Sequence, residues 1–216
     1  MHFSPDPPTN NRLEGMLEHL CGEYPEFGRS RVEALLRDSV QRLADGSTVL
    51  DFLPLLAYRL TRERLIAMMR TASDERPAAR YVSFISLSGG GRSQIAAALT
   101  NQLSRGRVSV HCMGTAIRGP LDPNVRAVIA ELGVDPDEAF ARPVTDEVLR
   151  ASDVIVTMGH SVGVVEIPPH ARHDDWRVGD PLGAPLFEVR RVRGDIERRV
   201  TSLLSELGVI EQLAAA

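Results

Sequence analysis

The stretch from Tyr81 to Leu103 constrains the fold more than any other part of the sequence. Residues 81–85 are a short apolar run rich in β-branched and aromatic side chains, which predicts a buried strand. A glycine-rich turn follows over residues 86–93, and an alanine- and leucine-rich segment predicts a helix over 94–103. Glycines let backbone N–H groups turn inward, and the first N–H groups of a helix lack partners. We therefore expect this turn to bind a phosphate-like oxyanion.

The turn does not have the pattern of a nucleotide-binding loop. It lacks the lysine of the G-x-x-x-x-G-K-[ST] motif, and it lacks the G-x-G-x-x-G spacing. Its arginine adds a planar guanidinium group that can bond two oxygens at once. The candidate oxyanion-binding residues are consecutive: Ser86, Leu87, Ser88, Gly89, Gly90, Gly91, Arg92 and Ser93. The alternative interpretation of the whole segment is a tight turn that binds no ligand. For Ser93 two roles stay open, a bond to the group at position 86 or a cap on the helix.

The composition indicates a globular protein and excludes several classes of function. The chain has 216 residues, 43% hydrophobic and 25% charged, with a net charge of −4. That charge gives no electrostatic basis for binding nucleic acid or an anionic membrane. No apolar run is long enough to span a membrane, and the N-terminus has no signal pattern, so we expect a cytoplasmic protein. All basic residues are arginine, which suggests a high-GC bacterium.

The cysteine count limits metal and redox chemistry. Only Cys21 and Cys112 occur, which excludes both a C-x-x-C pair and a four-cysteine zinc site. We expect no metal site and no cofactor. Cys21 continues an apolar helical face, and Cys112 lies on a predicted strand, so packing is the expected role of both.

Residues 1–71 are predicted to form a small three-helix bundle behind a polar tail. Apolar residues recur at helical spacing from Asn11, again from Ser30, and again from about residues 47–51. Ser30 and Glu33 have the spacing of a capping box. No cluster of metal-binding or catalytic side chains occurs in this region, so we expect an interaction module that can form a homodimer. Residues 72–80 read as a linker.

From residue 81 to 216 the pattern changes to alternating strands and helices. Strands are predicted at 81–85, 108–112 and 154–158, with a weaker one at about 170–177, and helices follow them, the last over 187–207. Such alternation predicts an α/β domain in which a four-stranded parallel sheet is flanked by helices. Ligands of such sheets bind at the carboxyl ends of the strands, where the Gly89–Arg92 segment falls.

The order Ser86, five residues, Arg92, Ser93 resembles the Cys-x5-Arg-Ser/Thr loop of low-molecular-weight protein tyrosine phosphatases and the arsenate reductases that share their fold. Three further segments are similar to that family: 111–115 with 122–124, 142–159, and 175–181. The resemblance implies that Asp180 occupies the position of the general acid. An N-terminal three-helix bundle accompanies some actinobacterial arsenate reductases of this type, which makes an actinobacterial source the expectation.

Ser86 stands where this family has its nucleophilic cysteine. The loop lowers the pKa of a cysteine so that it attacks as a thiolate, but an alcohol starts many units higher. Arsenate reduction also requires sulfur redox chemistry, which an alcohol cannot perform. Gly89 replaces the family's usual asparagine, and a loop altered at several positions favours natural divergence over one engineered substitution.

The expected function is therefore that of a non-catalytic relative of the arsenate reductases, which binds phosphate, arsenate, sulfate or a phosphorylated partner. One alternative is an active phosphatase that uses Ser86 with His160 or Asp180 as base, or a reductase that uses Cys112. Another is an interaction or dimerisation protein whose loop stays empty.

Overall fold

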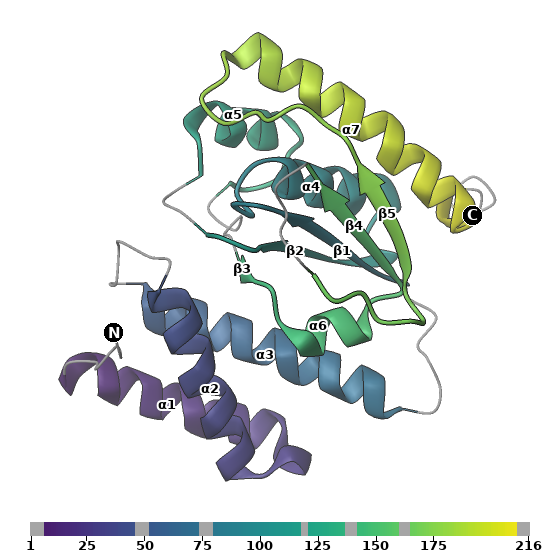
Figure 1. Ribbon diagram of the computed structural model, residues 1–216. Helices are drawn as coiled ribbons and strands as arrows, with labels where there is room; N and C mark the ends of the chain where they lie inside the picture. Colours follow the sequence, from purple (N-terminus) through teal and green to yellow (C-terminus); the bar gives the residue numbers. More distant parts are fainter. Residues whose placement is uncertain are drawn as a thin grey trace. The chain divides into compact units, whose positions relative to one another are not determined.

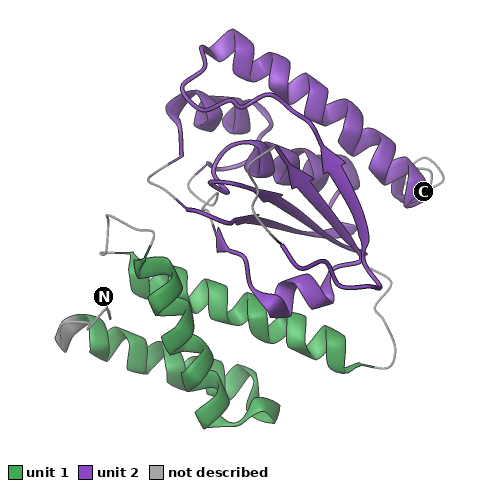
Figure 2. Cartoon of the chain, in the orientation of Figure 1, with its two compact units in different colours: residues 1–74 green, residues 75–216 purple. Residues whose placement is uncertain are grey.

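The computed structural model describes residues 7–45, 52–73, 80–117, 121–136, 142–159 and 165–210 (Figure 1). The chain forms two compact units, Met1–Asp74 and Glu75–Ala216 (Figure 2). Each unit buries its own cluster of apolar side chains. Most of the predicted linker, at residues 74–79, lies outside the described residues.

The first unit contains the three predicted helices. These are α1 (Pro7–Glu23), α2 (Arg29–Ala44) and α3 (Leu53–Ala72), with a short 3₁₀ turn at Pro25–Phe27. Each helix packs against the other two. Their apolar faces meet because leucines recur at helical spacing, and Leu20, Leu60 and Leu65 are fully buried. Cys21 is half-buried and packs against this core, as its position on the apolar face predicts.

The start of α2 differs from the prediction. Gly28, not Ser30, is the N-cap residue, and no side chain caps the helix. Gly28 has φ of +72°, a conformation that glycine adopts at little cost and that lets the chain turn from the 3₁₀ segment into α2. The preceding turn therefore fixes where the helix begins, and Ser30 becomes its second residue.

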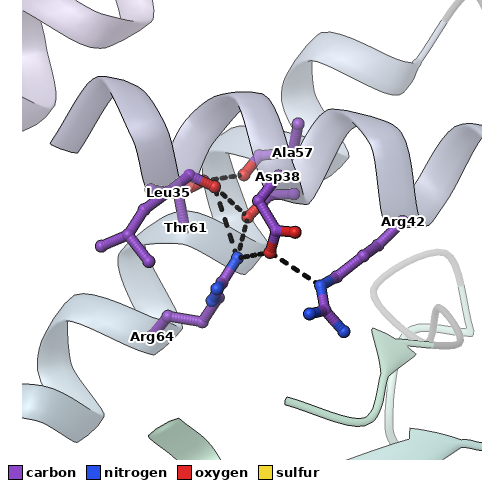
Figure 3. A network of polar contacts seen from close by, with 7 residues as sticks. Leu35, Asp38, Arg42, Ala57, Thr61 and Arg64 are labelled. Atoms are coloured by element: carbon purple, nitrogen blue, oxygen red, sulfur yellow. Dashed lines mark hydrogen bonds and ion pairs between the residues drawn. The ribbon is translucent and has the colours of Figure 1, made fainter. Parts of the chain in front are cut away.

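One arginine is buried between α2 and α3 (Figure 3). This residue is Arg64. Its Nη1 donates to the Leu35 carbonyl (3.3 Å), to Asp38 Oδ2 (2.7 Å) and to Ser39 Oγ (3.0 Å). Partial burial works to raise the pKa of Asp38, but hydrogen bonds from Arg42 and Arg64 outweigh it and lower that pKa. The ionised pair joins the two helices.

The second unit is an α/β domain. Its strands are β1 (Arg80–Ser86), β2 (Val108–Gly114), β3 (Arg142–Pro143), β4 (Val154–Met158) and β5 (Arg172–Trp176). Its helices are α4 (Arg92–Ser104), α5 (Pro123–Glu131), α6 (Asp146–Ala151) and α7 (Leu186–Glu206). The strands form one sheet in the order β3-β2-β1-β4-β5, and every neighbouring pair is parallel.

This architecture confirms the predicted parallel sheet flanked by helices and adds a short strand to it. β3 pairs only Met113 with Arg142 and Gly114 with Pro143 at one edge of the sheet. Two residues, one of them proline, carry no strand pattern in the sequence. The weakly signalled strand near 170–177 is β5, a charged edge strand that only Trp176 anchors in the core.

Helices lie on both faces of the sheet (Figure 1). α4, α5 and α7 pack together on one face, and α6 contacts β1 on the other. The central strand is buried on both faces, which explains why six of the seven residues of β1 are buried. Within the described ranges, no helix is long and apolar enough to cross a lipid bilayer.

Candidate functional site

The glycine-rich loop joins the carboxyl end of β1 to the N-terminus of α4. Ser86 ends β1 and pairs in register with Gly114 of β2 and Met158 of β4. Because all these strands are parallel, their carboxyl ends reach the same edge of the sheet. The eight residues predicted to bind an oxyanion therefore lie at the edge where such sheets bind ligands.

Two glycines allow the loop to pack closely on the end of β2. Gly89 has φ of +65°, a left-handed conformation that glycine adopts without strain and asparagine tolerates. A Cβ added to Gly114 would lie 2.7 Å from Gly89 N, so no other residue fits there. Ala116 N also donates to the Leu87 carbonyl (2.7 Å), and Gln94 Nε2 donates to the Gly89 carbonyl (3.1 Å). The loop is thus held by neighbours on both sides.

Several backbone N–H groups at the loop make no hydrogen bond within the described parts of the chain. They belong to Ser88, Gly91, Arg92 and Ser93. The first N–H groups of a helix point out of its N-terminal end, where the helix dipole favours negative charge. The α4 N-terminus therefore offers donors for an anion, and Gly91 is its N-cap residue, without a side-chain cap.

The Ser86 hydroxyl is engaged within the loop. Its residue is 1% exposed, and its Oγ accepts a hydrogen bond from Gly89 N (3.2 Å) and shares one with Ser93 Oγ (2.9 Å). Ser93 thus bonds the group at position 86. No histidine or carboxylate hydrogen-bonds this hydroxyl within the described residues. His160, considered above as a base, lies outside them.

Arg92 reaches across the edge of the sheet to the end of β4. A Cβ added to Gly159 would lie 2.7 Å from Arg92 Cζ and would clash with Nη1. The guanidinium group therefore occupies the space that the absent Gly159 side chain leaves. The Arg92 side chain is 12% exposed, and its Nη2 donates to Asp180 Oδ2 (3.2 Å).

Asp180 lies beside the loop in the segment that connects β5 to α7. Its side chain is 58% exposed, and its Oδ1 accepts a hydrogen bond from Leu182 N (3.2 Å). Pro181 lies so close to the loop that its Cγ would be 3.0 Å from a Cβ on Gly91. The structure therefore brings the candidate general acid to the candidate oxyanion loop.

Cys112 lies on β2, in register with Phe84 two residues before Ser86. It is 4% exposed, and Arg142 Nη1 contacts its Sγ at 3.6 Å. No cluster of three or more His, Cys, Asp and Glu side chains suited to a metal ion exists in the described part of the chain.

Sequence reasoning assigned no role to Gly114 and Gly159. Gly114 is the last residue of β2 and Gly159 directly follows β4, both on the ligand side of the sheet. A glycine at the carboxyl end of a parallel strand is the signal that could have identified both.

Comparison with known proteins places the second unit in one family. The sequence profile of the low molecular weight phosphotyrosine protein phosphatases matches residues 81–213. A putative arsenate reductase of Halobacterium salinarum is 31% identical over 129 residues, which cover 57% of this chain and 89% of the relative.

Two solved structures extend the comparison. A thioredoxin-dependent arsenate reductase of Corynebacterium glutamicum is similar with a TM-score of 0.81 and 27% identity, covering 92% of this chain and 98% of its own. Coverage of that extent includes the N-terminal helices. An arsenate reductase in a phosphate-binding state matches with a TM-score of 0.52 and 26% identity over 59% of this chain and 98% of its own.

Proposed function

Because this chain belongs to the low molecular weight phosphotyrosine protein phosphatase family and is related to its arsenate reductases, we propose that it binds a phosphate-type oxyanion without turning it over. The binding group is the Ser86–Ser93 loop. The ligand is free phosphate, arsenate or sulfate, or the phosphate group of a phosphorylated partner.

The observation that carries the proposal is the difference between Arg92 and Ser86. Arg92 is nearly buried and donates one hydrogen bond within the described residues, so most of its five N–H donors are available to an anion. Next to it in the chain lie N–H groups of the α4 N-terminus that have no partner in the described parts of the chain. These groups supply the charge-assisted bonds that oxyanions take.

Ser86, in contrast, has the environment of a structural hydroxyl. By the motif resemblance it stands at the position of the family's cysteine, but its Oγ already bonds Gly89 N and Ser93 Oγ. No base is bonded to it in the described residues, so none of these residues is placed to remove its proton. Reduction of arsenate further requires two electrons, which thiols supply when they form a disulfide and which an alcohol cannot supply. Ser86 therefore supports the shape of the loop and not a covalent step.

Thermal unfolding in the presence of millimolar phosphate, arsenate or sulfate tests the binding. We expect each oxyanion to raise Tm, because a ligand that binds only the folded state stabilises it. An aryl phosphate and arsenate should show no turnover above buffer. A Tm that no oxyanion changes would contradict the binding, and turnover lost in Ser86→Ala would contradict the non-catalytic assignment.

Cys112 provides a second candidate function, a reductase with its thiol outside the loop. The contact with Arg142 favours it, because a nearby guanidinium stabilises a thiolate. Cys112 is only 4% exposed, which opposes this function, since the thiol must reach both substrate and reductant. Thioredoxin-coupled arsenate turnover that disappears in Cys112→Ser but persists in Ser86→Ala would select this function.

A further inference from the structure

Asp122 connects the N-terminus of α5 to the segment that carries Asp180. As the N-cap residue of α5, it accepts hydrogen bonds at Oδ1 from Asn124 N (2.8 Å) and Val125 N (3.3 Å). Its second oxygen, Oδ2, accepts one from Gly183 N (3.1 Å). One carboxylate thus serves both a helix cap and a turn 61 residues further along the chain.

A second bond parallels the first. Asn124 Nδ2 donates to the Ala184 carbonyl (2.9 Å), so two adjacent residues of the turn are tied to the first turn of α5. The turn begins at Asp180, whose Oδ1 accepts from Leu182 N and whose Oδ2 accepts from Arg92. These hydrogen bonds, joined through the Leu182–Gly183 backbone, therefore connect α5 to Arg92 by way of the turn.

We propose that Asp122 is a positioning residue, which holds the Asp180 carboxylate beside Arg92 through the Gly183 bond. This inference rests on the proposed function, since its consequence is for oxyanion binding. The held carboxylate occupies one N–H of Arg92 and places a negative charge next to the incoming anion. The hydrogen bond between Asp122 and Gly183 therefore weakens binding of a doubly charged oxyanion and favours a less charged one.

The variant Asp122→Asn removes the hydrogen bond with Gly183 by changing a single atom. Its Oδ1 can still cap α5, because asparagine is as good an N-cap as aspartate. The second oxygen becomes an NH₂ group, which cannot accept from Gly183 N. The matched control is Asp153→Asn, which removes the same charge and likewise alters a carboxylate that accepts from a backbone N–H, that of Tyr81 (2.9 Å), near the opposite end of β1.

The first measurement is phosphate affinity, by calorimetric titration of the full-length protein. We expect Asp180→Ala to tighten phosphate binding about threefold to fivefold and Asp122→Asn about twofold, relative to Asp153→Asn, as for a partly exposed ion pair. In the Asp180→Ala background, Asp122→Asn should have no further effect, because a residue that acts through Asp180 cannot act without it. An equal effect in both backgrounds would overturn the inference, since a merely structural role does not depend on Asp180.

The second measurement needs no ligand. The Leu182 amide donates to Asp180, so its hydrogen exchange reports whether the turn is held. We expect exchange about tenfold faster in Asp122→Asn and unchanged in Asp153→Asn, and equal rates in the two variants would overturn the inference. If the wild-type protein bound no phosphate, the proposed function would fail, and this exchange measurement would still decide whether Asp122 positions Asp180.

Discussion

Two arginines of this chain are buried to a similar degree but differ in what surrounds them. Arg64, in the first unit, has a side chain that is 5% exposed and donates to Leu35 O, Asp38 and Ser39. Arg92, in the second unit, is 12% exposed and donates only to Asp180 within the described residues. The first guanidinium is bonded within its own unit, whereas most N–H donors of the second have no partner among the described residues. Burial alone therefore does not separate the two arginines, but their sets of partners do.

If Arg64 is structural, replacing it should cost stability and leave oxyanion binding unchanged. Arg64→Met keeps the apolar stem and removes the charge, so the first unit should lose about 2–3 kcal/mol, because Asp38, Ser39 and Leu35 O lose a donor between two helices. Urea unfolding followed by hydrogen exchange of α2 and α3 measures the loss.

Arg37→Met is the control for that substitution. Arg37 forms an exposed ion pair with Glu33, at 2.6 Å, and its removal should cost about 0.5 kcal/mol or less. Equal losses in the two variants would mean that the Arg64 network adds nothing beyond a surface pair.

If Arg92 binds the ligand, displacing it should cost affinity even when the arginine is present. A methyl group in Gly159→Ala occupies the place of the guanidinium, so phosphate affinity should fall about tenfold, or ~1.4 kcal/mol. The control is Gly133→Ala, at φ of +74° with open space around it, against +98° at Gly159. Both variants carry backbone strain, but only the first displaces Arg92, and a matching loss of affinity in both would contradict the clamp.

The smallest expected effect is a pH dependence confined to the first unit. The pKa of Asp38 is lower in the folded protein than in the unfolded chain, so its ionised form stabilises the fold above the unfolded value of about 3.9. That stabilisation disappears as the pH falls through the lowered folded pKa. We expect α2 and α3 to lose protection below about pH 4, and the deficit of Asp38→Asn relative to wild type to shrink there. A deficit that stays constant from pH 7 to pH 3 would contradict the assignment.

The sequence predicted the parts of this fold that depend on neighbouring residues. The apolar run 81–85, the glycine turn and the helix after it became β1, the loop and α4, because each signal is local. β3 was missed, since two residues paired at a sheet edge leave no periodic pattern. The capping box at Ser30 was wrong, because Gly28 and the turn before it set the start of α2.

The sequence named the residues of the candidate site but not the contacts between them. The motif placed Ser86, Arg92 and Asp180 together through a family resemblance, without any spacing rule that joins residues 88 positions apart. That Arg92 lies over Gly159 depends on the paths of β4 and α4 in space. The dual role of Asp122 likewise depends on a turn that returns to α5, which only the folded chain brings together.

The most direct test of the central claim is a calorimetric titration of phosphate into the wild-type protein and into Arg92→Ala. The account predicts binding of one phosphate per chain by the wild type, and affinity at least about tenfold weaker in Arg92→Ala, as for the loss of a charge-assisted hydrogen bond. The two proteins should differ in stability by less than about 1 kcal/mol, since the ion pair with Asp180 is partly exposed. No binding heat in the wild type, or equal affinity in both proteins, would contradict it.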